Sequence, residues 1–402
     1  MSLCSSSSSL RWSDLAHPVV AGLISVIVNY GGTFILVFQA ARVAGLSPEQ
    51  TASWVWSVSI GVGLTGLYLS WRYREPIITA WSTPAAAFLV TALAAAPYAE
   101  AIGAYMISAA AFVVLGMSGC FDRVVRLVPP GIASGLLAGI LLQFGVGAFG
   151  GATIDPLLVG LLFLAYVLLK RFSPRYAVVG LLALGLVFLV AQGRIDLSGL
   201  RFQLAIPVFT RPEFSLNALL SIALPLFLIT LTGQYMPGML VLRNDGFRTS
   251  ANPIVTVTGL GSLIMAPFGS HAFNIAAITA AIATGHEAHE DPSKRWVAGV
   301  AAGALYILVG VFGVTLAAVF MAFPATFIAA LAGLALLGTI GGSLARAMGE
   351  PASREAALIT FLASAANIKL FGVGGAFWGL VIGIVAHAAL HVPRGADKGS
   401  AG

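Results

Sequence analysis

The residues best suited to chemistry lie in one stretch, residues 266–285, which reads APFGSHAFNIAAITAAIATG. It opens with a helix-breaking run that contains Gly269, Ser270 and His271, and it continues as an apolar helix pattern. This helix is too short to cross a bilayer alone, because a full crossing needs about 20 residues. Its free N–H groups and the positive end of its dipole would favour an anion. The stretch therefore predicts a half-helix with an anion-binding end.

A second stretch, residues 79–93, has the same order of residue types and reads TAWSTPAAAFLVTAL. An aromatic residue and two small polar residues precede a helix start in both. An offset of 187 aligns Trp81, Ser82 and Thr83 with residues 268–270. Paired interrupted segments in the two halves of a membrane chain indicate the binding site of a transporter.

His271 is the one histidine of six that falls at a predicted helix break. With an ordinary pKa of about 6.5, a histidine can take up and release a proton in the physiological range. All fifteen carboxylates fall at or near a loop or a span end, which argues against an embedded Asp or Glu as the proton carrier. The alternative role for His271 is a neutral imidazole hydrogen-bonded to the backbone at the break.

Small polar residues accompany both breaks, and they are suited to hold a carboxylate beside backbone N–H groups. They are Ser82, Thr83, Ser270 and Asn274. Helix capping is their alternative role, and capping and binding can coexist.

Further candidates lie in the eighth predicted span and at the first break. Pro237 interrupts the span next to Gln234 and Tyr235, and polar residues at this depth are costly unless paired. Both are therefore candidates to line the site, and Asn29 occupies the matching place in the first span. Trp81 is suited to stack on an aromatic substrate, although ordinary packing explains it equally well.

The composition identifies the class of protein. Of 402 residues, 58% are hydrophobic and 9% are charged, and the mean hydropathy is +0.95. A soluble domain carries about 25% charged residues, so this is an integral membrane protein. The net charge is +6, and the charged residues fall in short predicted loops between spans. Their distribution therefore indicates the orientation of the chain in the membrane and not nucleic-acid binding. Cys4 and Cys120 have no partner spacing, and the charged cluster at 286–291 is expected to be a solvated loop, so we expect no metal site and no cofactor.

The apolar runs predict an all-α fold of about fourteen transmembrane segments, of which the third and the tenth are interrupted. The predicted spans lie near 17–41, 49–70, 77–95, 98–119, 130–149, 155–170, 175–192, 214–242, 252–265, 267–284, 295–321, 323–341, 352–368 and 374–392. The predicted organisation is a disordered cytoplasmic tail (1–16), a first repeat (17–192), an extracytoplasmic connection (193–212), a second repeat (213–392) and a cytoplasmic tail (393–402).

The two halves match at a constant offset of 194, which relates Gly116 to Gly310 and Pro130 to Pro324. Five of the 21 basic residues fall on one predicted side of the membrane, leaving sixteen on the side of the N-terminus. The positive-inside rule then places both termini in the cytoplasm. Seven spans per half is an odd number, so the second half is predicted to be inverted relative to the first.

One motif superficially suggests an enzyme. The run from Gly116 to Gly119 fits the G-x-S-G of intramembrane serine proteases, but its repeat mate keeps the glycines and lacks the serine. Close helix packing explains both copies, as it does the G-x-x-x-G runs at 135–139 and 299–303. Without a nucleophile and base pair, we do not expect an enzyme.

Four stretches together resemble the bacterial benzoate:proton symporter family (BenE). They read TAWSTPA from Thr79, LTGQYMPGMLVLR from Leu231, APFGSHAFNIAAITAAI from Ala266 and HEDPSKRW from His289. The resemblance covers nearly the whole chain, and it implies kinship with nucleobase and sulfate-type permeases.

The resemblance implies seven-plus-seven inverted repeats, a core and a gate domain, and short strands before the third and tenth helices, with the substrate between those helices. The strands would span about 77–82 and 266–269, with helices from Thr83 and Ser270. Nucleobase relatives carry glutamates on the eighth and tenth helices, whereas this chain has Gln234 near the first position and no glutamate in the second interrupted helix. A homodimer through the gate domain is compatible with the resemblance.

The sequence thus predicts a secondary transporter of the bacterial inner membrane that imports benzoate or a similar aromatic carboxylate with a proton by alternating access. His271 is the predicted proton carrier. The predicted substrate-binding residues are Trp81, Ser82, Thr83, Gln234, Tyr235, Gly269, Ser270, His271 and Asn274. The alternatives are a carrier of nucleobases or other organic anions, and an anion channel.

Overall fold

The protein is mostly helical in a computed structural model that describes residues 12–94, 96–127, 129–174, 177–195, 203–276, 279–286, 288–366, 370 and 375–391. The first half contains α1 (Trp12–Thr33), α2 (Ile35–Val43), α3 (Pro48–Tyr73), β1 (Thr79–Trp81), α4 (Thr83–Ala92), α5 (Tyr98–Ser118), α6 (Phe121–Leu127), α7 (Pro130–Gly150), α8 (Pro156–Phe172) and α9 (Ala177–Ala191). The second contains α10 (Leu216–Ala218), α11 (Leu224–Thr230), α12 (Met236–Asn244), α13 (Ala251–Met265), β2 (Phe273–Ile275), α14 (Ala280–Thr284), α15 (Trp296–Val311), α16 (Gly313–Met321), α17 (Ala325–Gly349), α18 (Arg354–Ala365) and α19 (Gly375–His391).

The length and composition of the helices confirm a multi-pass membrane protein. Within the described residues, eight helical stretches are long and apolar enough to cross a bilayer, namely Leu15–Val43, Pro48–Tyr73, Tyr98–Ser118, Pro130–Thr153, Leu216–Arg243, Ala251–Phe268, Pro292–Val311 and Ala325–Gly349. The span expected at 252–265 corresponds to Ala251–Phe268 among them. Helices α8 and α9 turn large apolar side chains outward, such as Leu164 and Val187, which suits contact with lipid.

Several boundaries differ from those expected. Helix α1 begins at Trp12, inside the expected tail, and α2 follows after a break at Phe34. The expected span at 295–321 is divided at Phe312 into α15 and α16. The expected tails at 1–11 and 393–402, and residues 196–202 of the connection, lie outside the described residues.

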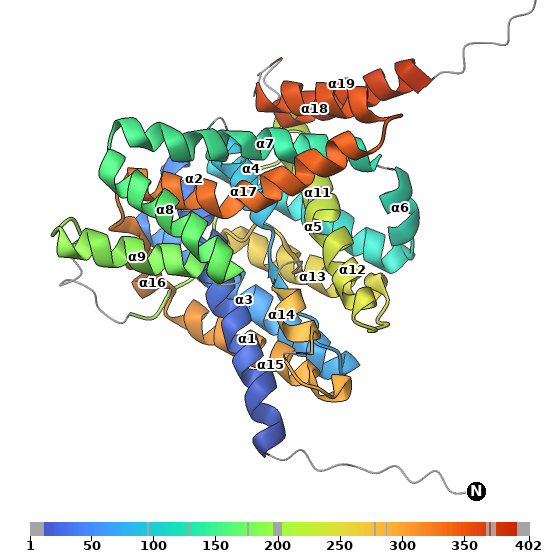
Figure 1. Cartoon of the computed structure of the whole chain (residues 1–402). Coiled ribbons are helices and arrows are strands. Elements are labelled where there is room, and N and C mark those ends of the chain that lie inside the picture. Colours follow the sequence, from blue (N-terminus) through green and yellow to red (C-terminus); the bar gives the residue numbers. More distant parts are fainter. Residues whose placement is uncertain are drawn as a thin grey trace, which may run out of the picture.

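The helices form two groups. In Figure 1, α7, α17, α18 and α19 lie in the upper part of the molecule, and α1, α3, α14 and α15 lie in the lower part. The strand group comprises α1, α3–α5 and α10–α15 with both strands, and its main packed pairs are α3 with α15 and α5 with α13. The flank group comprises α7–α9 and α17–α19, where α7 packs against both α17 and α18 and α8 packs against α9. This division places the two strands beside the boundary between the groups.

Glycines set the closest helix contacts, as the G-x-x-x-G runs predicted. A Cβ added to Gly139 on α7 would lie 2.5 Å from the carbonyl oxygen of Phe361 on α18. A Cβ on Gly116 would lie 2.6 Å from the backbone nitrogen of Thr256, so the G-x-S-G motif serves the contact between α5 and α13. Only the absence of side chains permits these approaches.

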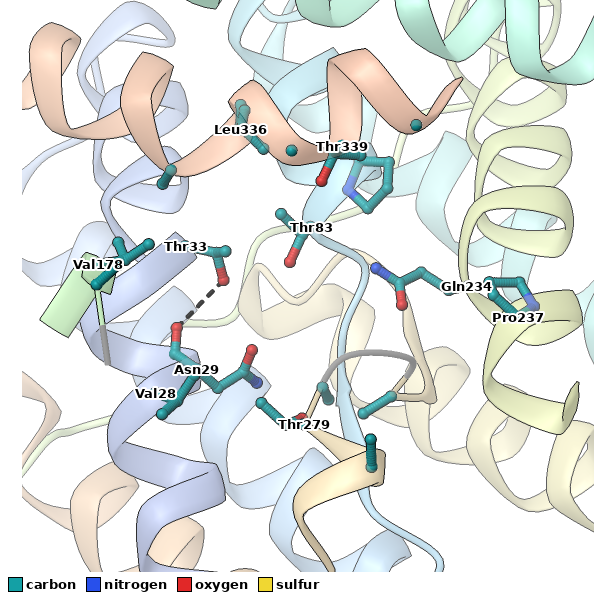
Figure 2. A pocket seen from close by; sticks show the side chains of 18 of the residues that line it. Val28, Asn29, Thr33, Thr83, Val178, Gln234, Pro237, Thr279, Leu336 and Thr339 are labelled. Carbon is teal, nitrogen blue, oxygen red and sulfur yellow. Dashed lines mark hydrogen bonds between the residues drawn. The ribbon is translucent and has the colours of Figure 1, made fainter. Parts of the chain in front are cut away.

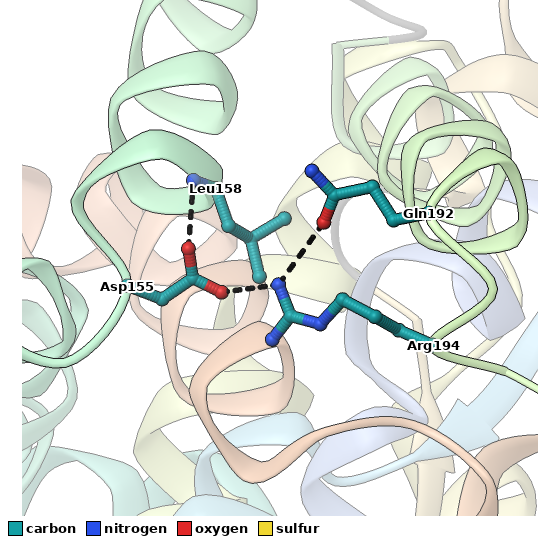
Figure 3. A network of polar contacts seen from close by, with 4 residues as sticks. All are labelled: Asp155, Leu158, Gln192 and Arg194. Atoms are coloured by element: carbon teal, nitrogen blue, oxygen red, sulfur yellow. Dashed lines mark hydrogen bonds and ion pairs between the residues drawn. The ribbon is translucent and has the colours of Figure 1, made fainter.

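At one end of the flank group, polar contacts hold α8 and α9 together (Figure 3). Asp155 caps α8 by accepting from the backbone N–H of Leu158, and its other oxygen lies 2.5 Å from a guanidinium nitrogen of Arg194 beyond α9. The same nitrogen lies 3.4 Å from the side-chain oxygen of Gln192. Burial acts to raise the pKa of Asp155, but the hydrogen bonds from Arg194 and Leu158 outweigh it and hold that pKa below its ordinary value.

The two strands pair antiparallel, with Thr79 opposite Ile275 and Trp81 opposite Phe273. Each strand is anchored to a long helix of the strand group. The Thr79 hydroxyl donates to the carbonyl of Val62 on α3, and the N–H of Phe273 donates to the hydroxyl of Ser262 on α13. Side chains and the partner strand thereby satisfy backbone groups of the buried strand residues.

The first break follows the prediction, with β1 inside 77–82 and α4 beginning at Thr83. The prediction for the second break was wrong by several residues. Residues 266–268 form a 3-10 turn, Gly269 has φ +108°, the strand is Phe273–Ile275, and α14 begins at Ala280. The left-handed glycine reverses the chain beside Trp54, so the run that resembles a helix start is a turn that leads into the strand.

Candidate functional site

A cavity of about 800 Å³ lies at the boundary between the strand group and the flank group. It is lined from the strand group by α1, both strand–helix breaks and the segment around Gln234, and from the flank group by α8, α9 and α17. Its volume is within the range of about 300–1,000 Å³ that is usual for small-molecule sites. The cavity is therefore the strongest candidate for the functional site.

The start of α4 forms one wall. Ser82 caps this helix, because its hydroxyl accepts from the backbone N–H of Ala85 at 3.3 Å and also accepts a hydrogen bond from the Thr230 hydroxyl at 3.1 Å. The next residues, Thr83 and Pro84, line the cavity. The positive end of the α4 dipole thus faces the open space.

Gln234 belongs to a π-helical segment, Leu231–Tyr235, which ends two residues before Pro237. Proline lacks the N–H that an α-helix would use and its ring crowds the preceding turn, so a wider turn relieves both problems. The same arrangement precedes Pro225, after the π-helical segment Leu219–Ala223. Next to Gln234, a Cβ on Gly233 would lie 3.3 Å from Pro84, which lets this helix approach α4 closely.

Six uncharged polar side chains surround the space, and Figure 2 labels all of them. They are Asn29, Thr33, Thr83, Gln234, Thr279 and Thr339. The side-chain amide nitrogen of Asn29 donates to the Tyr306 hydroxyl at 2.7 Å. The Thr33 hydroxyl donates to the backbone carbonyl oxygen of Asn29 at 3.2 Å. The Thr83 hydroxyl and the Gln234 amide point into the same space (Figure 2). We call these six residues the polar ring.

Apolar and aromatic side chains complete the wall. Trp81 belongs to the wall, but its side chain is fully buried, and its ring packs at 5.1 Å from the Tyr30 ring and 4.7 Å from the Phe34 ring. Its indole N–H donates to the Thr33 hydroxyl at 3.2 Å. Tyr166 of α8 contributes a second aromatic side chain. The cavity can therefore receive an apolar ring together with a polar group.

The charge of the lining has one sign. Lys170 in the last turn of α8 and Arg346 in the last turn of α17 are the only charged residues that line the cavity in the described part of the chain, and neither Asp nor Glu is among them. A cavity with two cations and no carboxylate favours an anion over a neutral or cationic molecule.

Three of the nine predicted site residues line the cavity, namely Trp81, Thr83 and Gln234. Ser82 is buried as the cap of α4. The Tyr235 hydroxyl lies 2.6 Å from the Thr258 hydroxyl and donates to the Phe273 carbonyl at 3.1 Å, so Tyr235 fixes β2.

Asn274 bridges the strands from a buried position. With its amide oriented to suit its neighbours, its nitrogen lies 3.3 Å from the Ala80 carbonyl oxygen and its oxygen 3.3 Å from the Ser82 N–H nitrogen. In this structure Asn274 joins β2 to β1 and to the cap of α4, and its role in substrate binding stays a prediction.

The turn that contains Gly269, Ser270 and His271 lies outside the cavity lining. His271 is buried, and its Nδ1 accepts from the indole N–H of Trp54 at 3.2 Å. No described residue forms a hydrogen bond with His271 Nε2 or with the Ser270 hydroxyl. Ser270 does not begin the second half-helix, because the chain first forms the turn and β2. The residues of this segment that precede α14 and line the cavity are Ala276 and Thr279.

Arg295 fixes the far end of α14. Its side chain is buried and donates to the carbonyl oxygens of Thr284 at 2.7 Å, His289 at 2.7 Å and Glu290 at 3.3 Å. A cation at the C-terminus of a helix is favourable, so Arg295 holds this short helix in place. The nearby loop holds no metal-ligand cluster among the described residues.

Sequence reasoning missed most of the flank group's contribution, including Tyr166, Lys170, Thr339 and Arg346. The distribution of basic residues predicts the side of the membrane on which Lys170 and Arg346 lie. It does not predict how deep their side chains lie or where they point. Thr339 is an isolated polar residue in an apolar, glycine-rich helix, and this pattern could have marked it as a candidate cavity residue.

Comparison with known proteins places the chain in a family. Residues 14–389 match the family described as benzoate membrane transport protein (BenE). The benzoate membrane transport protein of Acinetobacter baylyi (strain ATCC 33305 / BD413 / ADP1) is 42% identical over 375 residues, which cover 93% of this chain and 95% of that protein. The chain belongs to the benzoate membrane transport protein family. It is accordingly a membrane transporter of that family, and the general prediction of a non-enzymatic protein agrees with this assignment.

A second relative and two solved structures are also similar to this chain. The inner membrane protein YdcO of Escherichia coli (strain K12) is 40% identical over 374 residues, covering 93% of this chain and 96% of that protein. Among solved structures, SLC26A9 matches with a TM-score of 0.64 at 11% identity, covering 94% of this chain and 65% of that one. The transmembrane domain of the cyanobacterial bicarbonate transporter BicA matches with a TM-score of 0.61 at 15% identity, covering 94% and 99%. At these identities the two structures support the fold alone.

Proposed function

We propose that this family member imports benzoate or a similar aromatic carboxylate across the bacterial cytoplasmic membrane together with a proton, by alternating access. The observation that carries the proposal is the charge of the cavity. Lys170 and Arg346 line it and no described carboxylate does. The 42% identity to the benzoate membrane transport protein of Acinetobacter baylyi supports the choice of anion.

The proposed pose puts the carboxylate at the polar ring and the aromatic ring against the apolar wall. The Thr83 hydroxyl and the Gln234 amide are donors at the start of α4, where the helix dipole also favours an anion. Hydrogen bonds to a charged group contribute about 1.5–3 kcal/mol each. Val28, Val178 and Leu336 of the apolar wall can pack against the benzene ring, and Trp81 supports this wall from a fully buried position.

The proposed architecture is fourteen spans in a seven-plus-seven inverted repeat. The offset of 194 supports it, because it relates Thr79 to Phe273, the first residues of the two strands. The N–H of Ser82 donates to the Ala272 carbonyl and the N–H of Ala276 donates to the Ile78 carbonyl. The offset of 194 relates Ser82 to Ala276 and Ile78 to Ala272, so it exchanges these two hydrogen bonds. The same offset exchanges the packed pairs α3 with α15 and α5 with α13.

Alternating access is proposed as a shift of the strand group against the flank group, since the cavity lies between them. The cavity reaches the last turns of α8 and α17, which the distribution of basic residues assigns to the cytoplasmic side together with both termini. We therefore interpret this conformation as open to the cytoplasm. A homodimer through the flank group remains part of the proposal.

His271 is the proposed proton carrier, and its side chain is buried. It lies outside the cavity lining, so we propose that it acts through the backbone and not by contact with the substrate. The next residue, Ala272, accepts a hydrogen bond from the N–H of Ser82, the cap of α4. A change of charge on His271 would thus act on the helix end that faces the carboxylate.

The decisive experiment is uptake of labelled benzoate into proteoliposomes with an imposed inward proton gradient, with and without a protonophore. Protein-free liposomes are essential because benzoic acid crosses bilayers unaided. Protein-dependent accumulation that the protonophore and excess unlabelled benzoate both abolish is the expected result. Uptake equal to that of empty liposomes would refute benzoate as the substrate.

Two alternatives are separated in the same vesicles. A carrier of nucleobases or of other organic anions would show competition by those compounds and none by benzoate. An anion channel would dissipate a substrate gradient and would not accumulate substrate against one when only a pH difference is imposed.

A further inference from the structure

Lys170 and Arg346 lie at the same end of the cavity but outside the polar ring. Lys170 is in the last turn of α8 and Arg346 in the last turn of α17, and these two helices pack against each other. Both therefore belong to the flank group, whereas five of the six members of the polar ring belong to the strand group. The positive charge and most of the hydrogen-bonding groups are carried by different groups of helices.

The guanidinium of Arg346 is directed back along its own helix. It donates to the Ser343 hydroxyl at 3.2 Å, one turn earlier in α17. A Cβ on Gly342 would lie 3.5 Å from an Arg346 guanidinium nitrogen, which is an ordinary contact distance, so the guanidinium lies close to Gly342. Gly342 also lines the cavity, and the charge is thus held beside the cavity wall.

Neither cation is neutralised within the described part of the chain. The ion pairs found there join Arg194 to Asp155 and Arg243 to Asp122, away from both side chains. Unpaired charges of one sign at the opening of a low-dielectric cavity concentrate counter-ions inside it.

Basic residues in the last turns of α8 and α17 are explained by membrane orientation and by stabilisation of the helix ends. These two effects do not explain which of the basic residues face the cavity. Arg171 follows Lys170 in the same helix end and would serve orientation equally well. Arg171 does not line the cavity, and its guanidinium lies 5.8 Å from the Phe172 ring. Arg171 is therefore a matched control, because it carries the same charge at the same helix end without facing the cavity.

We propose that Lys170 and Arg346 form an anion-capture pair at the cavity opening, which selects for negative charge before the polar ring contacts the ligand. The pair takes small organic anions as a class, and it rests on the proposed function only for the identity of benzoate. It acts from the side to which the cavity opens, so it raises the apparent affinity for anions there and makes that affinity dependent on salt.

The test measures the electrical potential in the cavity without any substrate. A cysteine at Thr339, in a chain whose Cys4 and Cys120 are replaced by serine, reports from inside the cavity, and Thr279→Cys provides a second reporter on the other helix group. Inside-out vesicles are treated with an anionic (sulfonatoethyl) or a cationic (trimethylammonioethyl) methanethiosulfonate of similar size. The ratio of the two modification rates reports the local potential.

In the double variant Lys170→Gln/Arg346→Gln we expect the anionic-to-cationic rate ratio to fall about tenfold at low salt, with single variants intermediate. Arg171→Gln should leave the ratio unchanged, and Lys170→Arg with Arg346→Lys should retain it. High salt should abolish the difference between the parent and the double variant.

A ratio in the double variant equal to that of Arg171→Gln would overturn the capture pair. Because no step uses benzoate, failure of benzoate uptake and failure of the capture pair are separate results. Charge-dependent rates in a protein that does not accumulate benzoate would refute the proposed substrate and support the pair.

Discussion

The Thr230 hydroxyl donates a hydrogen bond of 3.1 Å to the Ser82 hydroxyl and so joins α11 to the cap of α4, across 148 residues of sequence. Ser82 also accepts from the Ala85 N–H and uses its own N–H to bond the turn before β2. One small residue thus links three segments around the helix end that we assign to the carboxylate.

The variant Ser82→Ala is expected to lower the free energy of unfolding by about 1–2 kcal/mol, since it removes a helix cap and leaves the Thr230 hydroxyl without its acceptor. It should also raise the half-saturation concentration for benzoate, because the start of α4 is less well fixed. Thermal unfolding in detergent and initial uptake rates are the measurements. Thr91→Val in the same helix removes a hydroxyl that bonds only the preceding turn. Equal behaviour of the two variants would contradict the role of Ser82.

Gln234→Glu is expected to weaken benzoate uptake at least tenfold, because a carboxylate in a low-dielectric cavity repels an anionic substrate. The readout is the half-saturation concentration in proteoliposomes. Gln192→Glu adds the same charge near Arg194, outside the cavity, and should leave uptake unchanged. An unaltered half-saturation concentration in Gln234→Glu would exclude this residue from the site.

For His271→Gln we expect loss of accumulation driven by a pH gradient, with exchange of labelled for unlabelled benzoate retained. The reason is that glutamine keeps an amide in the position of the imidazole but does not titrate. His286→Gln changes an exposed loop histidine and serves as the control. Full pH-driven accumulation by His271→Gln would end the proton role of this residue.

Gly139→Ala is expected to destabilise the protein by about 1–3 kcal/mol, because the new Cβ would lie 2.5 Å from the Phe361 carbonyl oxygen. Gly147→Ala in the same helix meets no atom within 4 Å and should be neutral or slightly stabilising. A thermal shift that is the same for both alanine variants would show that α7 and α18 tolerate a larger separation.

The first break could be predicted from sequence, since Ser82, Thr83 and Pro84 form a helix start that the local sequence specifies through a capping serine and a proline. The second could not. Gly269 and Ser270 present the same local pattern, but the register of β2 is set by pairing with a strand far away in the sequence. The offset of 194, visible in the glycines and prolines, relates the two strands, whereas the local match at 187 does not.

Three of the predicted site residues line the cavity because they flank a proline or a helix start, features that local sequence reveals. Tyr166, Lys170 and Arg346 reach the cavity only through the packing of α8 and α17 beside the strand group, and no local pattern reports that packing. Asn274 shows the reverse case, since a buried amide between two strands has the same sequence appearance as a ligand-binding one.

The pairing of β1 with β2 has a consequence for the order of events during biogenesis. The carbonyl of Ile78 and the N–H of Ser82 find their partners only in residues 276 and 272, which are synthesised almost two hundred residues later. Until then these groups have no partner in the strand, and unpaired backbone groups within a bilayer cost several kcal/mol each. The pairing of the two strands can therefore be completed only after residues 272–276 have been synthesised, so the structure around β1 depends on the second half of the chain.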